Sequence, residues 1–393
     1  MTNSFLSQRL FSPCPVCFEN EFQKLVIFEN RSYFGACRHC GLSYRSPLPS
    51  DELLEKVYSG FGQSYPDNVL MDQRSDFSTF ARERFSLFKG RLGLHKPGKL
   101  LEIGSGYGLF LRLFRETAWE VHGVEPSMAQ ADFSRNVLGL KDIQCCTIAD
   151  AHFVHGSFDA ICAFHVIEHL RDPIAMLLKS RELLKSRGTL FIATPNLERL
   201  KINIIQYYFL YHALHLTLFT RATLSALLGR CGFEVLHVEQ EVDLPAEQGS
   251  MIVEAKLAPA RQADCPRDLV YAESYAEQIE RLREKLIKGF RNWKQKGLSV
   301  AIYGAGIHTR GMLECLGPAR SCVKLIYDDD PAKTGRKLHG ISIEPLEQQN
   351  CKGIDLIVVS SLASEKNILE RLERSENFPE SIGFYRDILG YGC

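Results

Sequence analysis

Between residues 99 and 255, short apolar runs alternate with stretches of helical pattern. The runs occupy residues 100–103, 121–124, 160–164 and 189–193, and a late run at 250–255 closes the series. Short apolar runs of this kind predict buried strands. Strands that alternate with helices predict a parallel sheet with helices on its faces, which is the α/β fold class.

A second series of the same kind follows a break in the pattern. Residues 258–268 contain two prolines among polar residues and predict a linker. A charged amphipathic helix is predicted over 270–296, and a new strand begins at 299–303. The glycine-containing turn at 304–306 echoes the one at 104–106. We therefore expect two nucleotide-binding-like α/β parts rather than a solenoid, which needs several short repeats.

One segment, 202–220, carries no Asp, Glu, Lys or Arg over 19 residues. Its length alone would permit a membrane span. Its amide, imidazole and hydroxyl side chains would, however, need hydrogen-bond partners that lipid does not supply. We therefore expect no membrane span, and we predict a buried helix or a lid over a binding pocket.

Composition limits the classes of protein that fit. The 393 residues are 45% apolar and 24% charged, as in ordinary globular proteins, and the formal net charge is zero. A chain without a general positive field is not expected to bind nucleic acid. Residues 1–13 lack the apolar core of a secretion signal, which favours a reducing, cytoplasmic location. The sequence leaves the oligomeric state open.

Four of the 13 cysteines form two Cys-x-x-Cys pairs, separated by 19 residues. The pairs are Cys14 with Cys17 and Cys37 with Cys40. Two such pairs can supply the tetrahedral four-thiolate shell of structural zinc, and their spacing is typical of zinc ribbons. A closed shell leaves no open coordination position, so the predicted zinc serves folding rather than chemistry. The alternative is four free structural cysteines.

The glycine-rich turn after the first predicted strand has carboxylates at informative distances. Glu102 lies two residues before Gly104, and Glu125 ends the next predicted strand, 21 residues after that glycine. Glycines let a ligand approach the backbone closely where a parallel sheet reverses its strand order. A carboxylate at the end of the second strand can accept hydrogen bonds from both hydroxyls of a ribose.

Further segments complete this pattern. A third strand is predicted at 148–150, where Asp150 precedes Ala151, and the strand at 158–164 runs into the segment 165–170. Thr194-Pro195-Asn196 follows the fifth predicted strand. Together with the glycine turn, these segments resemble the class I S-adenosylmethionine-dependent methyltransferases over roughly residues 95–255.

The resemblance implies S-adenosyl-L-methionine as cofactor. This sulfonium carries no phosphate, so its turn needs no phosphate-binding lysine, and a carboxylate such as Glu102 suits its ammonium group. Glu125 is then the ribose carboxylate and Asp150 lies on the adenine side. The implied cofactor-binding residues are Glu102, Gly104, Ser105, Gly106, Gly108, Glu125, Pro126, Asp150, Ala151 and His165.

Residues 165–169 also match the H-x-x-E-H pattern of inverted zinc proteases. That pattern must lie on a helix to aim both histidines at one metal ion. Here it directly follows a predicted buried strand and meets Asp172-Pro173. We therefore interpret His165 as part of the cofactor site, and leave a structural role open for His169.

The order of the parts resembles the zinc-containing deoxysugar C-methyltransferases, which act on nucleotide-linked sugars. Residues 327–336 are close to that family's DDNPAKQG segment, and 248–251 resemble its glycine-serine strand entrance; 40–42 and 58–65 are also similar. The resemblance implies a Rossmann-like class I methyltransferase domain with an N-terminal zinc ribbon and a C-terminal Rossmann-like α/β domain. The predicted domains are 1–90, 91–258 and 259–393.

The same resemblance supplies candidate catalytic residues. Residues 211–219 correspond to the family's YHEHLSYF stretch, and His215 stands at the position of its base. Leu214 replaces the adjacent catalytic glutamate, which leaves open whether carbon, oxygen or nitrogen is methylated. Tyr65 and Tyr211 are the candidates for orienting the acceptor, a small molecule for which a nucleotide-linked sugar is the implied class.

Two other functions stay open at this stage. The first is an NAD-dependent oxidoreductase that uses Gly304 and Gly306, although Thr309 stands where the third glycine of the dinucleotide fingerprint would be. The second is a zinc-containing scaffold protein with a vestigial cofactor site.

Overall fold

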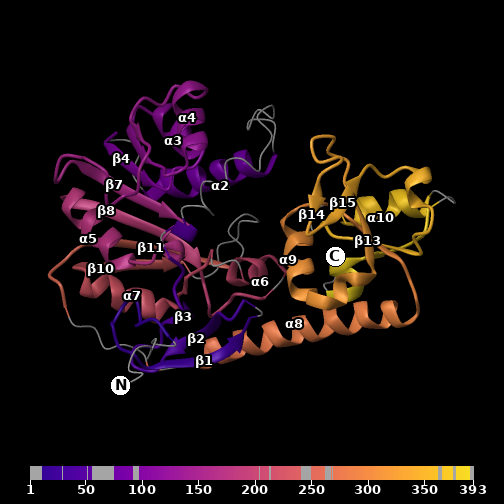
Figure 1. Ribbon diagram of the computed structural model, residues 1–393. Coiled ribbons are helices and arrows are strands. Elements are labelled where there is room, and N and C mark those ends of the chain that lie inside the picture. Colours follow the sequence, from indigo (N-terminus) through magenta and orange to yellow (C-terminus); the bar gives the residue numbers. More distant parts are fainter. Residues whose placement is uncertain are drawn as a thin grey trace, which may run out of the picture. The chain divides into compact units, whose positions relative to one another are not determined.

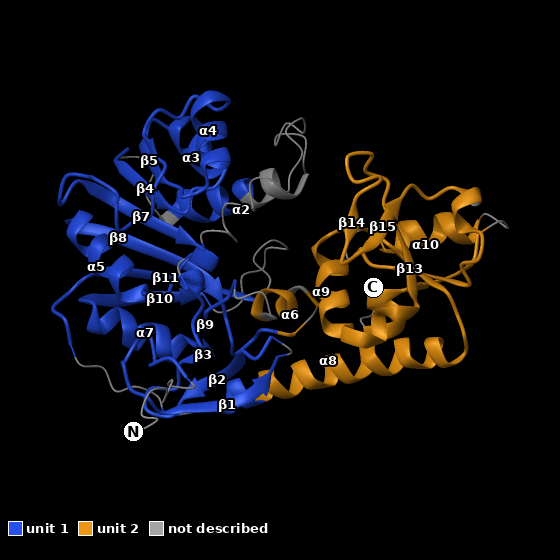
Figure 2. Cartoon of the chain, viewed as in Figure 1, with its two compact units in different colours: residues 1–200, 213–273 blue, residues 201–212, 274–393 orange. Residues whose placement is uncertain are grey.

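The computed structural model describes residues 11–28, 30–50, 52–54, 75–91, 97–202, 204–211, 214–239, 249–261, 267, 269–361, 365–374 and 378–389. Contacts divide the chain into two compact units, residues 1–200 with 213–273 and residues 201–212 with 274–393 (Figure 2). A short segment, residues 201–212, that lies in the sequence between the two parts of the first unit therefore belongs to the second unit. The three-domain division at residues 90 and 258 stays a prediction.

The larger sheet of the first unit has seven strands in the order β10-β11-β8-β7-β4-β5-β6 (Figure 1). The strands are β4 Lys99–Ile103, β5 Glu120–Val124, β6 Ile143–Gln144, β7 Phe158–Phe164, β8 Leu184–Pro195, β10 Phe233–Glu239 and β11 Ser250–Leu257. β11 is antiparallel to both of its neighbours, and the other pairs are parallel. The strand order reverses between β4 and β7, and ligands of open α/β sheets bind at this point.

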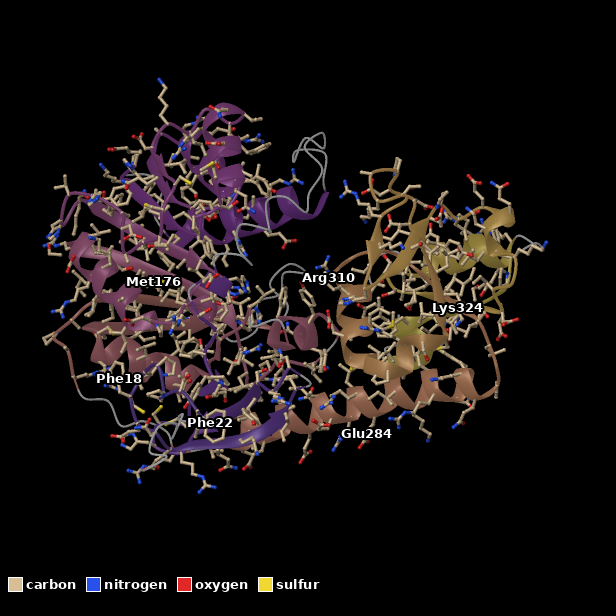
Figure 3. All side chains as sticks on the ribbon, in the orientation of Figure 1. Phe18, Phe22, Met176, Glu284, Arg310 and Lys324 are labelled. Carbon is tan, nitrogen blue, oxygen red and sulfur yellow. The ribbon has the colours of Figure 1, made fainter. Side chains whose placement is uncertain are left out.

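Helices cover both faces of this sheet. They are α2 Ser75–Arg91, α3 Leu109–Arg115, α4 Met128–Asn136, α5 Pro173–Leu183 and α7 Arg221–Arg230. Adjacent residues of one strand belong to different cores: Leu100 packs in the cluster that includes α2 and α3, and Leu101 in the one that includes α5 and α7. Met176 of α5, labelled in Figure 3, belongs to the second of these cores. Burial on both faces explains why the strands read as continuous apolar runs.

The third strand was predicted at the wrong place. Residues 148–150 form a turn, and the strand is the two-residue β6. The Asp150 amide donates to the Thr147 carbonyl at 3.2 Å, and the Thr147 hydroxyl donates to the Asp150 carboxylate at 2.6 Å. Such local hydrogen bonds of Thr and Asp stabilise turns in competition with strands.

A second, small sheet joins the N-terminal segment to residues far along the chain. It consists of β1 Phe22–Ile27, β2 Tyr33–Cys37, β3 Ser43–Ser46 and β9 Thr217–Leu218, in the order β1-β2-β3-β9. β9 pairs antiparallel with β3, with Ser43 opposite Leu218 and Tyr44 opposite Thr217. The cysteine-bearing hairpin and the segment after His215 therefore share one sheet.

The second unit repeats the parallel α/β plan that its apolar runs predicted. Its strands are β12 Val300–Tyr303, β13 Val323–Tyr327, β14 Lys337–Leu338, β15 Ile341–Glu344, β16 Leu356–Val359 and β17 Glu380–Gly383. They follow the order β14-β15-β13-β12-β16-β17, and only the β14–β15 pair is antiparallel. The strand order again reverses at the first strand, here β12.

The helices of this unit are α6 Ile204–Tyr211, α8 Val270–Gln295, α9 Ile307–Leu316 and α10 Glu365–Glu373. Short helical turns lie at Ile167–His169 in the first unit, and at Gly317–Cys322, Gln348–Cys351 and Phe384–Leu389 in the second. α6 packs closely on α9, since a Cβ atom added to Gly311 would lie 2.6 Å from the Ile204 carbonyl oxygen. Among the described helices, none combines the length and apolar character needed to cross a membrane.

Candidate active site

The glycine turn between β4 and α3 is tied to the end of β5. The Gly106 amide donates to Glu125 Oε2 at 2.8 Å, and the Ser127 amide donates to Glu125 Oε1 at 2.8 Å. Gly104, Gly106 and Gly108 all have positive φ, between 53° and 73°. This left-handed backbone favours glycine, and in this conformation the Gly106 amide of the turn reaches the Glu125 carboxylate.

Two buried polar atoms beside this turn fit the implied cofactor. Glu102 and Ser105 are only 3% and 6% exposed. Within the described part of the chain, Glu102 Oε2 and Ser105 Oγ have no hydrogen-bond partner. A Cβ atom on Gly106 would meet no atom closer than 3.7 Å, so a ligand can approach the backbone there. An ammonium group placed beside Glu102 would supply the missing donor.

Burial also shifts the acidity of the two carboxylates. It raises the pKa of Glu102 to about 8, against the opposing charge of Arg84. Burial raises the pKa of Glu125 as well, although its two backbone hydrogen bonds act in the opposite direction. Without a ligand, Glu102 is therefore largely protonated at neutral pH, and a cation at this position would favour its charged form.

The predicted adenine-side residues lie in a loop that a glutamine holds closed. The Gln144 amide group donates to the His152 carbonyl at 2.8 Å and accepts from the His152 amide at 3.0 Å. Asp150 is exposed, and Ala151 is buried in the core cluster that also contains Leu101. The Cys145 thiol lies 3.9 Å from the carbonyl oxygen of Pro126. Sequence reasoning missed the role of Gln144, because a glutamine that clamps a loop has no local sequence signal.

A buried carboxylate and three histidines gather at the ends of β7 and β8. We call Glu168, His165, His169 and His215 the histidine cluster. Glu168 is fully buried; its Oε1 lies 3.2 Å from His165 Nδ1, and its Oε2 accepts from the Thr194 hydroxyl at 3.1 Å. The rings of His169 and His215 have their centroids 4.9 Å apart. The chain thus brings two of the predicted site residues, His165 and His215, to the same carboxylate.

The charges of the histidine cluster follow from burial and mutual contact. Burial alone would raise the pKa of Glu168, but the His165 hydrogen bond and the charges of the histidines lower it to about 2. Burial lowers the pKa of His215 to about 3, and His169 acts in the same direction. Burial also lowers the pKa of His169. At neutral pH the cluster therefore contains a carboxylate beside neutral rings of His169 and His215.

The histidine cluster is not arranged like a protease metal site. The donor atoms of Glu168, His169 and His215 lie within 4.8 Å of one another. His165, the first histidine of the protease pattern, is not part of this set, and its Nδ1 lies 3.2 Å from Glu168 Oε1, while His169 Nδ1 contacts the Leu214 carbonyl. The segment leaves β7 as a single 3₁₀ turn, Ile167–His169, rather than an α-helix. Both observations agree with the rejection of the protease pattern.

The two predicted tyrosines cannot be placed in the site. Tyr65 lies outside the described residues, and Tyr211 ends α6 with a side chain that the structure does not describe. His215 is described and only 5% exposed. In its first part the charge-free stretch forms a buried helix, α6, in which Ile204, Tyr207 and Leu210 are buried. The roles of both tyrosines stay predictions.

The four N-terminal cysteines have the geometry of a metal shell. Their sulfur atoms all lie within 4.8 Å of one another, with Cys14 and Cys40 3.6 Å apart and Cys17 and Cys37 3.5 Å apart. Tetrahedral zinc with Zn–S bonds of about 2.3 Å requires sulfur separations of about 3.8 Å. The donor set therefore fits a thiophilic cation such as zinc.

Tight turns of the backbone bring these sulfurs together. The Phe18 amide donates to the Cys14 carbonyl at 2.9 Å, and the Gly41 amide donates to the Cys37 carbonyl at 2.8 Å. Both residues have positive φ, 64° at Phe18 and 73° at Gly41. Phe18 is exposed, and Figure 3 labels it at this end of the first unit.

In the C-terminal turn, as in the first one, a carboxylate accepts hydrogen bonds from two backbone amides. The C-terminal turn does not, however, have the carboxylate that would bind an ammonium group. The Ala305 amide donates to Asp328 Oδ2 at 2.6 Å, and the Asp330 amide donates to Asp328 Oδ1 at 2.9 Å. Lys333 Nζ lies 3.0 Å from the same carboxylate. Ile302 occupies the position that Glu102 holds in the first turn. This turn therefore lacks the carboxylate for an ammonium group, and a dinucleotide there stays an alternative.

Two protein families match successive parts of the chain. A methyltransferase domain matches residues 77–238, and a C-methyltransferase C-terminal domain matches residues 238–377. With the strand order and glycine turn described above, the match shows that the chain has the Rossmann-like fold of the class I S-adenosylmethionine-dependent methyltransferases. Within that class it resembles the C-methyltransferases, because the second matched domain is theirs.

Individual proteins with similar sequences share less than a third of their residues with this chain over the aligned parts. The C-methyltransferase NovU of Streptomyces niveus is 26% identical over 288 residues, 67% of this chain and 65% of that protein. A probable S-adenosylmethionine-dependent methyltransferase of Mycolicibacterium smegmatis is 29% identical over 175 residues, 43% of this chain and 66% of that protein. The chain thus matches just under two thirds of the length of each.

Among solved structures, similarity extends to 1,6-didemethyltoxoflavin-N1-methyltransferase of Burkholderia thailandensis, crystallised with 1,6-didemethyltoxoflavin and S-adenosylhomocysteine. The TM-score is 0.42 at 16% identity, over 55% of this chain and 95% of that one.

Proposed function

We propose that the protein transfers a methyl group from S-adenosylmethionine to carbon in a small-molecule acceptor. The observation that carries the cofactor assignment is the pair of buried polar atoms, Glu102 Oε2 and Ser105 Oγ, beside a glycine turn that is open at Gly106. Glu102 binds the ammonium group, and Glu125 accepts from the ribose hydroxyls. Transfer to carbon is supported by the matched C-methyltransferase C-terminal domain.

The bound cofactor supplies an electrophilic methyl group, and the histidine cluster handles the acceptor's proton. His215 is neutral at physiological pH, so one ring nitrogen can accept the proton that the acceptor loses. The imidazolium that forms is stabilised by the buried Glu168 carboxylate close by. Because a low pKa makes His215 a weak base, the mechanism favours an acidified carbon, such as one next to a carbonyl group.

Several finer features belong to the same proposal. A nucleotide-linked sugar is the acceptor class, because the order of the three parts and residues 327–336 resemble the enzymes that act on such sugars. Zinc is the ion at the four-cysteine cluster, supported by the sulfur separations. A reducing cytoplasm is the compartment, supported by the described cysteines outside the four-cysteine cluster, whose thiols are free.

The test of the base is His215→Ala. We expect single-turnover methyl transfer to fall by at least about 10²-fold, the usual contribution of a general base, with cofactor affinity nearly unchanged. His155→Ala is the matched control, since the His155 side chain is 73% exposed and its Nε2 lies 3.9 Å from Glu182 Oε2, at the limit of an ion pair. A loss below about threefold, or a loss of cofactor binding instead, would return His215 to a structural role.

A further inference from the structure

The backbone beside His215 is held by the cysteine-bearing hairpin. The Arg45 amide of β3 donates to the Leu216 carbonyl at 2.8 Å. The next residues form β9 and pair with β3, with Tyr44 opposite Thr217. β3 is thus the direct neighbour of the segment that starts at His215.

The same segment is tied on its other side to the histidine cluster. The Leu216 amide donates to the backbone carbonyl of Glu168 at 2.7 Å. Leu216 therefore connects two backbones, donating to Glu168 and accepting from Arg45. His215 directly precedes this connection, so its position depends on β3 as well as on the histidine cluster.

β3 in turn depends on the cysteines. Cys37 is the last residue of β2 and Cys40 lies in the turn that leads to β3, and the Cys37 amide donates to the Leu42 carbonyl at 2.9 Å. Three of the four strands in this sheet come from residues 22–46. Small metal-binding elements of this size take much of their folding free energy from the metal. Loss of the ion is therefore expected to loosen β3.

We propose that the four-cysteine metal site positions His215, through β3 and the β3–β9 pairing, so that metal loss disables methyl transfer while cofactor binding persists. The cofactor turn lies in the seven-stranded sheet and is tied to β5 through Glu125, without a link to β3 among its described hydrogen bonds. The effect on catalysis rests on the function proposed above for His215. The effect on the backbone does not.

The first experiment removes the metal from the full-length protein with a chelator and follows amide hydrogen exchange. We expect exchange at Arg45 and across residues 214–219 to accelerate by at least about tenfold, because local opening controls exchange. S-adenosylmethionine affinity should stay within about twofold, and turnover should fall by at least about 10²-fold, as expected for a misplaced catalytic group. Unchanged exchange at 214–219 after metal loss would overturn the proposal, whatever happens to activity.

The second experiment breaks the coupling and leaves the cysteines intact. Arg45→Pro removes the amide that donates to Leu216, whereas Arg45→Ala keeps it and changes only the side chain. The proline variant should retain one metal ion per chain and its cofactor affinity, but lose at least about tenfold more turnover than the alanine variant. Equal turnover in the two variants would contradict the proposal.

The two proposals fail in different ways. If exchange at 214–219 accelerates but His215→Ala has the activity of the unmodified protein, the assignment of the base is wrong and the metal-dependent positioning stands. If His215→Ala is inactive but exchange at 214–219 does not respond to the metal, the base stands and the coupling is wrong.

Discussion

The carboxylate of Glu102 lies in surroundings that suit a cation. Its Oε2 lacks a hydrogen-bond partner among the described residues, and burial raises its pKa to about 8. Leaving a buried acceptor without a donor costs roughly 1–3 kcal/mol. A ligand with an ammonium group would remove that cost and bind the charged form of Glu102, so proton release and cofactor binding are linked.

This linkage predicts how cofactor affinity depends on pH. Below pH 8 the unliganded Glu102 is mostly protonated, and the cofactor's ammonium group requires the carboxylate. Affinity should therefore rise by nearly tenfold between pH 6 and pH 7, and should fall again above about pH 8, where the α-amino group loses its own proton. Calorimetry in buffers of different ionisation enthalpy should detect close to one proton released per cofactor at pH 7. In Glu102→Gln the rise between pH 6 and 7 should disappear; a rise of the same size in that variant would exclude Glu102 as its cause.

The site residues that could be predicted from the sequence are those that stand at a characteristic spacing from one another along the chain. The cysteine pairs, the glycines and Glu125 stand at fixed distances that follow from ligand geometry and strand length. The contact of Arg45 with Leu216 could not be predicted in this way, because it joins two residues that are 171 positions apart in the sequence. The placement of Glu168 among three histidines likewise depends on the return of the chain at residue 215.

At the scale of elements, the turn into α3 depends on glycine for two separate reasons. Gly108 has φ 73°, and an added Cβ atom would lie 2.6 Å from Leu140 Cδ1 and 2.8 Å from Ser134 Oγ. Leu140 is buried, so its methyl group has little room to move away. Gly156, in the same unit, also has a positive φ of 60°, but its nearest contact would be an ordinary 3.9 Å. An alanine at Gly156 would therefore suffer backbone strain alone, whereas an alanine at Gly108 would suffer both backbone strain and steric overlap.

We therefore expect the two alanine variants to differ in stability. Gly156→Ala should cost about 1–2 kcal/mol, the strain of a left-handed alanine. Gly108→Ala should cost about 1–3 kcal/mol more, because of overpacking at the start of α3. Urea unfolding of both variants measures the difference. Equal losses would mean that Leu140 and Ser134 move aside without cost.

The strands that the sequence analysis located, among them β4, β7 and β12, were predictable because their side chains are buried on both faces of a sheet, which produces runs of apolar residues. β6 escaped prediction because two residues, Ile143–Gln144, are too few to produce such a run. The run at 148–150 was mistaken for it, although its threonine–aspartate hydrogen bond closes a turn. β9, also two residues long, is specified by its partner β3 rather than by its own sequence.

At the scale of the whole molecule, the chain interleaves its two compact units. Residues 201–212 belong to the second unit, and the chain then returns to the first for residues 213–273. The interleaved helix α6 packs on α9 at Gly311, where an added Cβ atom would lie 2.6 Å from the Ile204 carbonyl oxygen and 2.8 Å from Tyr208 Cβ. Backbone atoms cannot move aside as a flexible side chain can, so this contact requires a glycine.

Two glycines in helices of the second unit should respond to alanine in opposite directions. Gly289 of α8 would place its Cβ atom with nothing within 4 Å, so Gly289→Ala should stabilise the unit by about 0.5–1 kcal/mol through helix propensity. Gly311→Ala should destabilise it by about 1–3 kcal/mol, because α6 must separate from α9. Thermal unfolding of both variants provides the test. A stabilising Gly311→Ala would show that α6 does not hold that position in solution.

The interleaving restricts how such a gene can exchange parts by recombination. A single crossover after the codon for residue 273 would transfer most of the second unit but leave residues 201–212 from the other parent. The hybrid would be compatible only if the incoming α9 also carried a small residue opposite Ile204. Inheritance of the C-terminal unit is therefore conditional on a short sequence encoded more than sixty codons upstream, within the methyltransferase half.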